Sequence, residues 1–183
     1  MRRLVAWNLM TLDGYFEGKT PWALDFHETV WGDELHDFSL EQGREAGTLL
    51  FGRRTYEGMA DYWTKATGDI ADMMNSIDKA VATRTLDEAT WNNTRLLKGD
   101  AVEAVRALKA EDRKDIFVFG SANLLDSLLT AGLVDEYRIC LAPVVLVGGN
   151  PLFKPRESEL RMRLESTRPL KTGGVVLTYR MNG

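Results

Sequence analysis

The sequence predicts an α/β fold with a mixed sheet, mostly parallel at first and antiparallel at its C-terminal end. Short apolar segments alternate with amphipathic helical patterns up to Val134, as in chains built from βαβ units. The segment Ile116–Phe119 is a run of four apolar residues, which is typical of a strand buried on both faces. After Val134 the pattern changes to strand-like segments alone.

In the first half, apolar runs predict strands over Arg3–Met10, Thr48–Phe51, Lys79–Thr83 and Thr94–Leu97. Apolar residues at helical spacing predict helices marked by Trp31–Gln42, which ends near Gly47, and by Tyr56–Trp63, Ile70–Ile77 and Ala101–Leu108. Asp69 and Asp100 each stand where a residue would cap the helix that follows.

In the second half, Leu124, Leu125, Leu128 and Leu129 mark the inward side of a helix that ends before Gly132. Strands are expected after it at Glu136–Ala142, Val144–Val147, Arg161–Ser166 and Gly174–Met181. The last two pair naturally as a hairpin. The clean alternation in Arg161–Glu165 predicts one solvent-exposed face.

Length and composition point to one cytoplasmic domain over 1–183. The 183 residues match the usual size of a single domain. A net charge of −4 offers no electrostatic reason to bind nucleic acid or a membrane surface. The apolar stretch Leu141–Val147 is too short to span a bilayer, and Leu4–Trp7 is too short for a signal-peptide core. The single cysteine, Cys140, excludes an internal disulfide and fits a reducing compartment as a buried, inert thiol.

Strand ends followed by glycine and small or cationic residues indicate an anion site. Gly120 and Ser121 follow a buried strand and open a helix, whose free N–H groups and dipole favour a phosphate; a plain capped helix is the alternative. Gly52, Arg53, Arg54 and Thr55 follow an earlier strand, where cations oppose the helix dipole and so point to a ligand; two solvated arginines are the alternative.

Thr83 and Arg84 end a third strand. Because ligands gather beyond the carboxyl ends of parallel strands, the three junctions together suggest a nucleotide with several phosphates. The acidic residues around His27 and His36 match no metal-ligand spacing, so a solvated helix face is favoured and no metal is expected. Trp22 stands in a loop, where it either lines a ring pocket or closes the core.

Five segments, in this order, resemble the dihydrofolate-reductase-like superfamily: Met10–Tyr15, Leu50–Glu57, Phe119–Leu124, Gly132–Tyr137 and Pro143–Phe153. The match is closer to the C-terminal reductase domain of the bifunctional riboflavin-biosynthesis deaminase-reductase and its single-domain bacterial relatives. The resemblance implies a three-layer α/β/α fold, NADPH as cofactor and a homodimer. It also implies hydride transfer to a pteridine-like or pyrimidine-like small molecule, at a CH-NH, CH=N or carbonyl group.

The resemblance also implies roles for individual residues. It assigns the pyrophosphate and the 2′-phosphate to Gly52, Arg53, Arg54 and Thr55, and the adenine ribose to Thr83 and Arg84. The other side of the pyrophosphate falls to Gly120, Ser121, Ala122, Asn123 and Leu124. The end of the first strand, with Asn8, Leu9 and Asp13, would lie near the nicotinamide.

The proton donor departs from the family pattern. Counting back from Gly52 places His36 where dihydrofolate reductase has its carboxylate, with Asp33 and Asp37 one turn away. These three residues are the catalytic candidates, with water as the alternative proton source. The resulting function resembles 5-amino-6-(5-phosphoribosylamino)uracil reductase, although no unambiguous basic pair for a ribose phosphate is present. The alternative is a nucleotide-, pterin- or flavin-binding protein of the same fold without catalysis.

Overall fold

Residues 1–181, which the computed structural model describes, form one eight-stranded sheet in the order β5-β4-β3-β6-β1-β7-β10-β9. The strands are β1 (Leu4–Thr11), β3 (Ala46–Gly52), β4 (Lys79–Ala82), β5 (Thr94–Leu97), β6 (Asp115–Phe119), β7 (Glu136–Ala142), β9 (Met162–Pro169) and β10 (Val175–Met181). The six from β5 to β7 in sheet order are parallel, whereas β10 is antiparallel to both neighbours. The predicted mixed sheet and C-terminal hairpin are confirmed.

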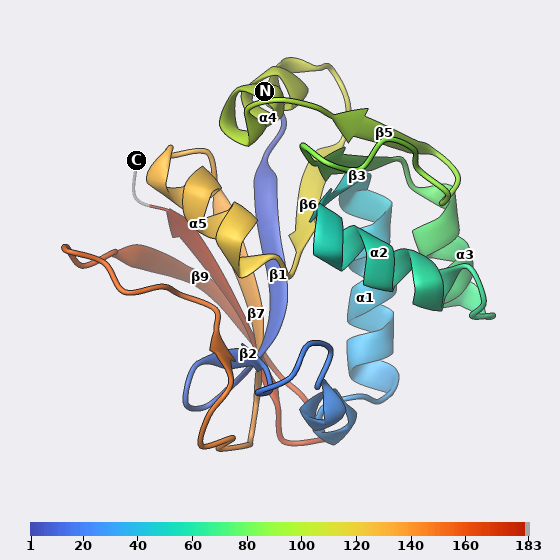
Figure 1. Cartoon of the computed structure of the whole chain (residues 1–183). Helices are drawn as coiled ribbons and strands as arrows, with labels where there is room; N and C mark the ends of the chain where they lie inside the picture. Colours follow the sequence, from blue (N-terminus) through green and yellow to red (C-terminus); the bar gives the residue numbers. More distant parts are fainter. Residues whose placement is uncertain (182–183) are drawn as a thin grey trace.

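Helices cover both faces of this sheet. One face carries α1 (Asp33–Glu45), α2 (Arg53–Trp63) and α3 (Asp69–Ser76), and the other carries α4 (Ala101–Ala110) and α5 (Ala122–Thr130). Figure 1 shows α1 and α2 on one side of β1 and α5 on the other. The fold is therefore the three-layer α/β/α arrangement that the resemblance implies. Among residues 1–181, no helix has the length and hydropathy needed to cross a membrane.

Alternation along β1 divides the core into two halves. Val5 and Trp7 face the layer of α1, α2 and α3, whereas Leu4 and Ala6 face the layer of α4 and α5. All four are buried, since successive side chains of a central strand point to opposite faces and both are covered. The strand is thereby held at the centre of the sheet, next to the end of β6.

The segment Val144–Val147 is a loop, so its prediction as a strand is wrong. The carboxylate of Asp13 accepts hydrogen bonds from the backbone N–H groups of Leu146 (3.1 Å) and Val147 (2.8 Å). Val147 has φ of +62°, outside the extended region. These contacts take the place of a strand ladder. The next strand pairing along the chain is the short ladder of β8 (Asn150–Pro151) with β2 (Tyr15–Glu17).

The helix boundaries confirm one predicted cap and correct another. Asp100 caps α4 by accepting from the N–H groups of Val102 and Glu103. Asp69, by contrast, is the first residue of α3, and the capping position is Gly68, whose φ of +103° favours glycine. Trp31, which the helical spacing included, precedes α1 and is exposed.

The strand β9 is more exposed than its alternating sequence predicts. Leu164, on the expected buried face, retains an exposed fraction of 50%. The strand lies at the sheet edge beyond β10, outside the area that the helices cover (Figure 1). The local pattern specifies alternation correctly, but burial of either face requires a second layer that this chain does not place there.

Candidate functional site

The carboxyl ends of β3, β4 and β6 meet at one edge of the sheet, beside the middle of β1. The register pairs Gly52 with Ala82, Leu50 with Val118 and Trp7 with Phe119. A cavity of about 1090 Å³, here called the cleft, opens at this edge. The structure brings together there the predicted residues Asn8, Leu9, Gly52, Arg53, Arg54, Thr55, Thr83, Arg84, Gly120, Ser121, Ala122, Asn123 and Leu124.

Two of the helices that begin at the cleft have neither a capping side chain nor an acidic residue in the first turn. These are α2, which begins at Arg53, and α5, which begins at Ala122. The helices α1, α3 and α4 each carry carboxylates in the first turn. Negative side chains ordinarily occupy this position because they complement the helix dipole. Their absence from α2 and α5 leaves backbone N–H groups at these two helix starts available to an anion.

Ser121 joins the two helix starts instead of capping its own. It occupies the capping position of α5 with a left-handed φ of +58°, and its side chain makes no capping bond, so the plain capped helix given as the alternative does not form. Its hydroxyl accepts from the backbone N–H of Gly52 (3.2 Å) and shares a hydrogen bond with the hydroxyl of Thr55 (2.7 Å). A Cβ added at Gly52 would lie 2.6 Å from this hydroxyl, so the close approach requires glycine.

The cationic side chains of the cleft differ in their partners. Arg53 forms an ion pair with Glu57, at 2.9 Å between Nη1 and Oε1. Arg54 and Arg84 are exposed and form no ion pair with the described part of the chain. Thr83 is buried, and its hydroxyl accepts from the N–H groups of Thr85 (3.2 Å) and Leu86 (2.9 Å). The arginines can therefore meet a ligand, whereas Thr83 shapes the loop beside it.

Asn8, in β1, forms a hydrogen bond with Gly120, the residue that follows β6. When its buried amide is oriented to satisfy both ends, Oδ1 accepts from the N–H of Gly120 and Nδ2 donates to the carbonyl of Trp7, each at 3.1 Å. Gly120 has φ of +59°, a conformation that glycine adopts without strain. This bond holds the backbone turn open toward the cleft.

Asp13, a predicted cofactor-binding residue, does not line the cleft. Its carboxylate accepts from the Thr11 hydroxyl (2.7 Å) as well as from the loop amides of Leu146 and Val147. These hydrogen bonds, with that of Thr11 first, lower the pKa of Asp13. Its role is to hold the loop after β7 against the end of β1.

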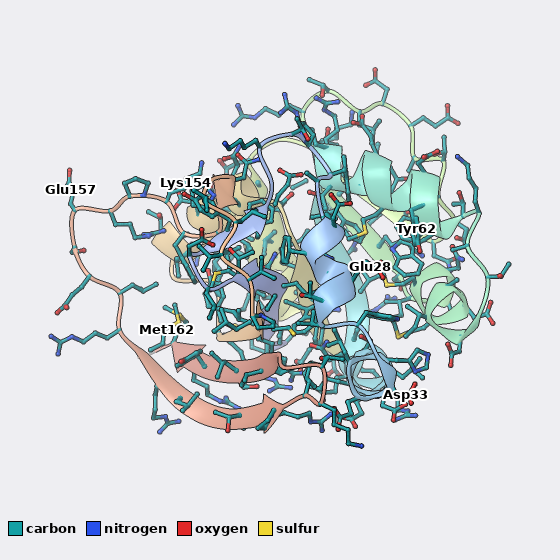
Figure 2. The ribbon with its side chains drawn as sticks, turned by 90° about the horizontal axis from the view of Figure 1, so that it is seen from below. Glu28, Asp33, Tyr62, Lys154, Glu157 and Met162 are labelled. Atoms are coloured by element: carbon teal, nitrogen blue, oxygen red, sulfur yellow. The ribbon has the colours of Figure 1, made fainter. Side chains whose placement is uncertain are left out.

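Asp33, His36 and Asp37 do not line the cleft either, so the structure places none of the three catalytic candidates there. They belong to the first turns of α1, where His36 Nε2 lies 2.9 Å from Asp69 Oδ1 of α3. This bond raises the pKa of His36. In Figure 2, Asp33 and the cleft residue Lys154 lie at opposite sides of the molecule. The gapless count from Gly52 fails because helical register, not sequence distance, decides which residues of α1 face inward.

A second cavity of about 170 Å³, here called the inner cavity, adjoins the cleft and shares Trp7, Leu9, His27, Met59 and Phe119 with it. It lies between the sheet and the layer of α1, α2 and α3. Two of its buried polar atoms, His27 Nε2 and Gln42 Oε1, have no hydrogen-bond partner among the described residues. Burial lowers the pKa of His27 to about 4.

Sequence reasoning did not select the two residues of the inner cavity that have unpartnered polar atoms, His27 and Gln42. For Gln42 a signal was present, because it is a polar residue at an inward position of an otherwise apolar helical spacing. His27 carries no comparable signal. Trp22, one of the two alternatives left open by its loop position, lines the cleft with its ring packed against Gly58, where an added Cβ would lie 1.9 Å from the ring.

The three-layer α/β/α domain, with its cleft at the carboxyl ends of the parallel strands, has a dihydrofolate-reductase-like fold. The model of the RibD C-terminal domain matches residues 2–176, and the chain belongs to that family.

The chain is also similar to individual proteins, among them solved structures with the same fold. The chain is 30% identical to the uncharacterized protein YyaP of Bacillus subtilis (strain 168), over 100% of this chain and 96% of that protein. It resembles the crystal structure of a Shewanella sp. PV-4 protein whose name links it to riboflavin biosynthesis (TM-score 0.82, 22% identity, 99% of each chain). It also resembles Enterococcus faecalis dihydrofolate reductase in complex with NADP(H) (TM-score 0.64, 18% identity, 99% of this chain and 97% of that one).

Proposed function

We propose that the protein is an NADPH-dependent reductase that transfers hydride to a pteridine-like or pyrimidine-like small molecule, at a CH-NH, CH=N or carbonyl group. The main support for this proposal is that α2 and α5 both begin at the cleft without a capping side chain or a carboxylate in the first turn. Membership of the RibD C-terminal family supports a reductase-like fold.

The residues of the cleft fit a dinucleotide with several phosphates. The helix starts at Gly52 and Ser121 offer N–H groups to a pyrophosphate from two sides. Arg54 and Arg84 offer unpaired guanidinium groups, which suit a terminal phosphate better than a neutral ribose. NADPH, when bound, would supply the hydride. Asn8 and Leu9 would border its nicotinamide end, beside the inner cavity.

The protein's own contribution to the reaction is orientation rather than a strong acid. Among the described residues that line the inner cavity, none is Asp, Glu, Lys or Arg. His27 is neutral at pH 7 because burial lowers its pKa to about 4. We therefore assign the proton of the reduction to water entering from the cleft, in place of Asp33, His36 or Asp37.

The same absence of an acid favours one alternative, a protein that binds a nucleotide together with a pterin or flavin without catalysis. The two functions differ in turnover and not in binding. Oxidation of NADPH in the presence of pterins, pyrimidines and flavins supports the reductase. Tight binding of both ligands without any oxidation of NADPH supports the binding protein.

We also propose a cytoplasmic location and a homodimer. The single cysteine, Cys140, is buried, and burial raises its pKa to about 12, so the thiol is inert. The exposed edge strand β9 supports association with a second copy.

The first experiment is a fluorescence titration of the purified chain with NADPH and, in parallel, with NADH. Micromolar affinity for NADPH and much weaker binding of NADH is the expected result. If neither nucleotide binds, the proposal is overturned, because the proposed reductase requires the nucleotide to bind in the cleft.

A further inference from the structure

The inner cavity has the size of one six-membered ring. An apolar cavity of roughly 150 Å³ holds benzene, and the inner cavity has about 170 Å³. Its wall consists of aromatic and aliphatic side chains from the sheet and three helices, with Trp7 and Phe119 at the boundary to the cleft. A flat ring placed there would lie beside the site proposed for the nicotinamide.

Two polar atoms interrupt this apolar wall without any partner. Gln42 has an exposed fraction of 3%, and its side-chain Oε1 has no hydrogen-bond partner within the described residues. The Nε2 atom of His27 is also buried and also has no hydrogen-bond partner within the described residues. Native proteins pair nearly all buried polar atoms, because an unpaired one costs the free energy of its lost hydration. A ligand that supplies the missing partners would explain both.

The occupant must be uncharged. No described residue of the inner cavity carries a charge at pH 7, since His27 is the sole titratable group among those that line it and its pKa is about 4. A phosphate or carboxylate there would be buried without a counter-charge. Any ionic part of the substrate must remain in the cleft.

The side-chain amide of Gln42 narrows the class of ligand that the inner cavity can bind. A side-chain amide presents one acceptor, Oε1, and one donor group, Nε2, side by side in a plane. This arrangement is complementary to a ring lactam, in which an N–H and a C=O are adjacent. Paired hydrogen bonds of this kind satisfy both ends of the amide at once.

We propose that the inner cavity binds a neutral six-membered ring through its lactam edge, held by the Gln42 amide with His27 as the second polar contact. This inference rests on the proposed function, because the ring becomes a reductase substrate only when NADPH occupies the cleft. Its binding, however, can be measured without turnover.

The test compares two ring compounds by calorimetry on the full chain at pH 6, with and without NADP⁺. Lumazine is a neutral pteridinedione whose pyrimidine ring carries free N–H groups and matches the inner cavity in size, with the fused second ring extending into the adjoining cleft. In 1,3-dimethyllumazine both lactam nitrogens are methylated. The wild type should bind lumazine at least about tenfold more tightly, since the methylated ring leaves the amide unpaired. Replacing Gln42 with Met, which has a similar volume, should bring this ratio close to one.

A matched control lies one turn earlier on α1. Ser39 also lines the inner cavity, but its hydroxyl already donates to the carbonyl of Leu35 at 2.8 Å. Ser39→Ala should therefore preserve the lumazine preference. Gln42→Met removes an unpaired amide from apolar surroundings, so it should fold at least as stably as the wild type. Gln42→Glu is a second variant and should bind neither ring, because it buries a carboxylate.

Three outcomes would overturn the inference: no binding of lumazine by the wild type at millimolar concentration, equal affinities for the two rings, or an unchanged preference in Gln42→Met. Failure of NADP⁺ to bind would instead count against the proposed function, and the lactam preference of the nucleotide-free protein would still be decided by the same titrations.

Discussion

The hydroxyl groups of Thr55 and Ser121 lie 2.7 Å apart, although the residues are 66 positions apart in the sequence. Thr55 is in the first turn of α2, and Ser121 occupies the capping position of α5. The bond therefore holds together the two helix starts that line the cleft. It is the contact on which the spacing of the proposed pyrophosphate site depends.

Gly52→Ala should disturb this contact by steric overlap alone. Gly52 has φ of −78° and ψ of 161°, which alanine adopts freely, but its Cβ would meet the Ser121 hydroxyl at 2.6 Å. Overpacking of this kind costs about 1–3 kcal/mol of unfolding free energy. In the background of Ser121→Ala, which lacks the hydroxyl, the same change should cost much less. Urea unfolding of the two single variants and the double variant measures the coupling, and strict additivity would contradict the steric explanation.

Arg54→Ala should weaken NADPH far more than NADH. Arg54 forms no ion pair in the described chain, so its loss removes a charge-assisted bond of about 1.5–3 kcal/mol to the 2′-phosphate. Arg53→Ala should have a smaller effect, because Arg53 must first leave Glu57. Fluorescence titrations with both nucleotides give the comparison. Equal losses for NADPH and NADH would mean that Arg54 does not contact that phosphate.

The two histidines of the chain should titrate in opposite directions from the ordinary value near 6.5. The bond to Asp69 raises the pKa of His36, whereas burial lowers the pKa of His27 to about 4. NMR of the imidazole protons resolves the two groups. Asp69→Asn should lower the pKa of His36 and leave that of His27 in place. A His27 that titrates near 6.5 would show that its ring is solvated.

The low pKa of His27 also predicts an acid-dependent loss of stability. Between pH 6.5 and 4 the unfolded chain binds a proton at His27 that the folded chain does not, so the unfolding free energy falls as the pH falls. The expected contribution is about 3 kcal/mol over that interval. Denaturant unfolding at a series of pH values should show that His27→Phe removes this component and that His36→Gln, at a half-buried position, does not.

If β9 forms the dimer interface, sedimentation should show a dimer that Leu164→Asp converts to a monomer. Leu164 is half exposed on the edge strand, where a charge would oppose pairing with a second copy. Val147→Asp is the control, since Val147 is exposed at 82% on a loop outside the sheet. A dimer that survives Leu164→Asp and is lost in Val147→Asp would place the interface at that loop.

Much of the fold could be predicted because its signals are local. Apolar runs and helical spacing located the central strands and all five helices within a few residues, and Asp100 identified the start of α4. The glycine and arginine junctions also identified most of the cleft, because parallel strands carry their carboxyl ends to one edge whatever their order in the sequence. The segment Val144–Val147 failed because the hydrogen bonds that define it come from Asp13, which is distant in the chain.

The sequence by itself determined the α/β class, the strand–glycine–helix junctions and the family resemblance, since each depends on the order and spacing of nearby residues. The tertiary structure alone decided which polar side chains reach the inner cavity. His36 points to Asp69 on the outer side of α1, whereas His27 and Gln42 face inward. Their directions are set by how α1 and the preceding 3₁₀ turn, Asp25–Thr29, pack on a sheet assembled from distant segments. The helical spacing of α1 marks Gln42 as inward, but it contains no information about His27 or about the cavity that both residues reach.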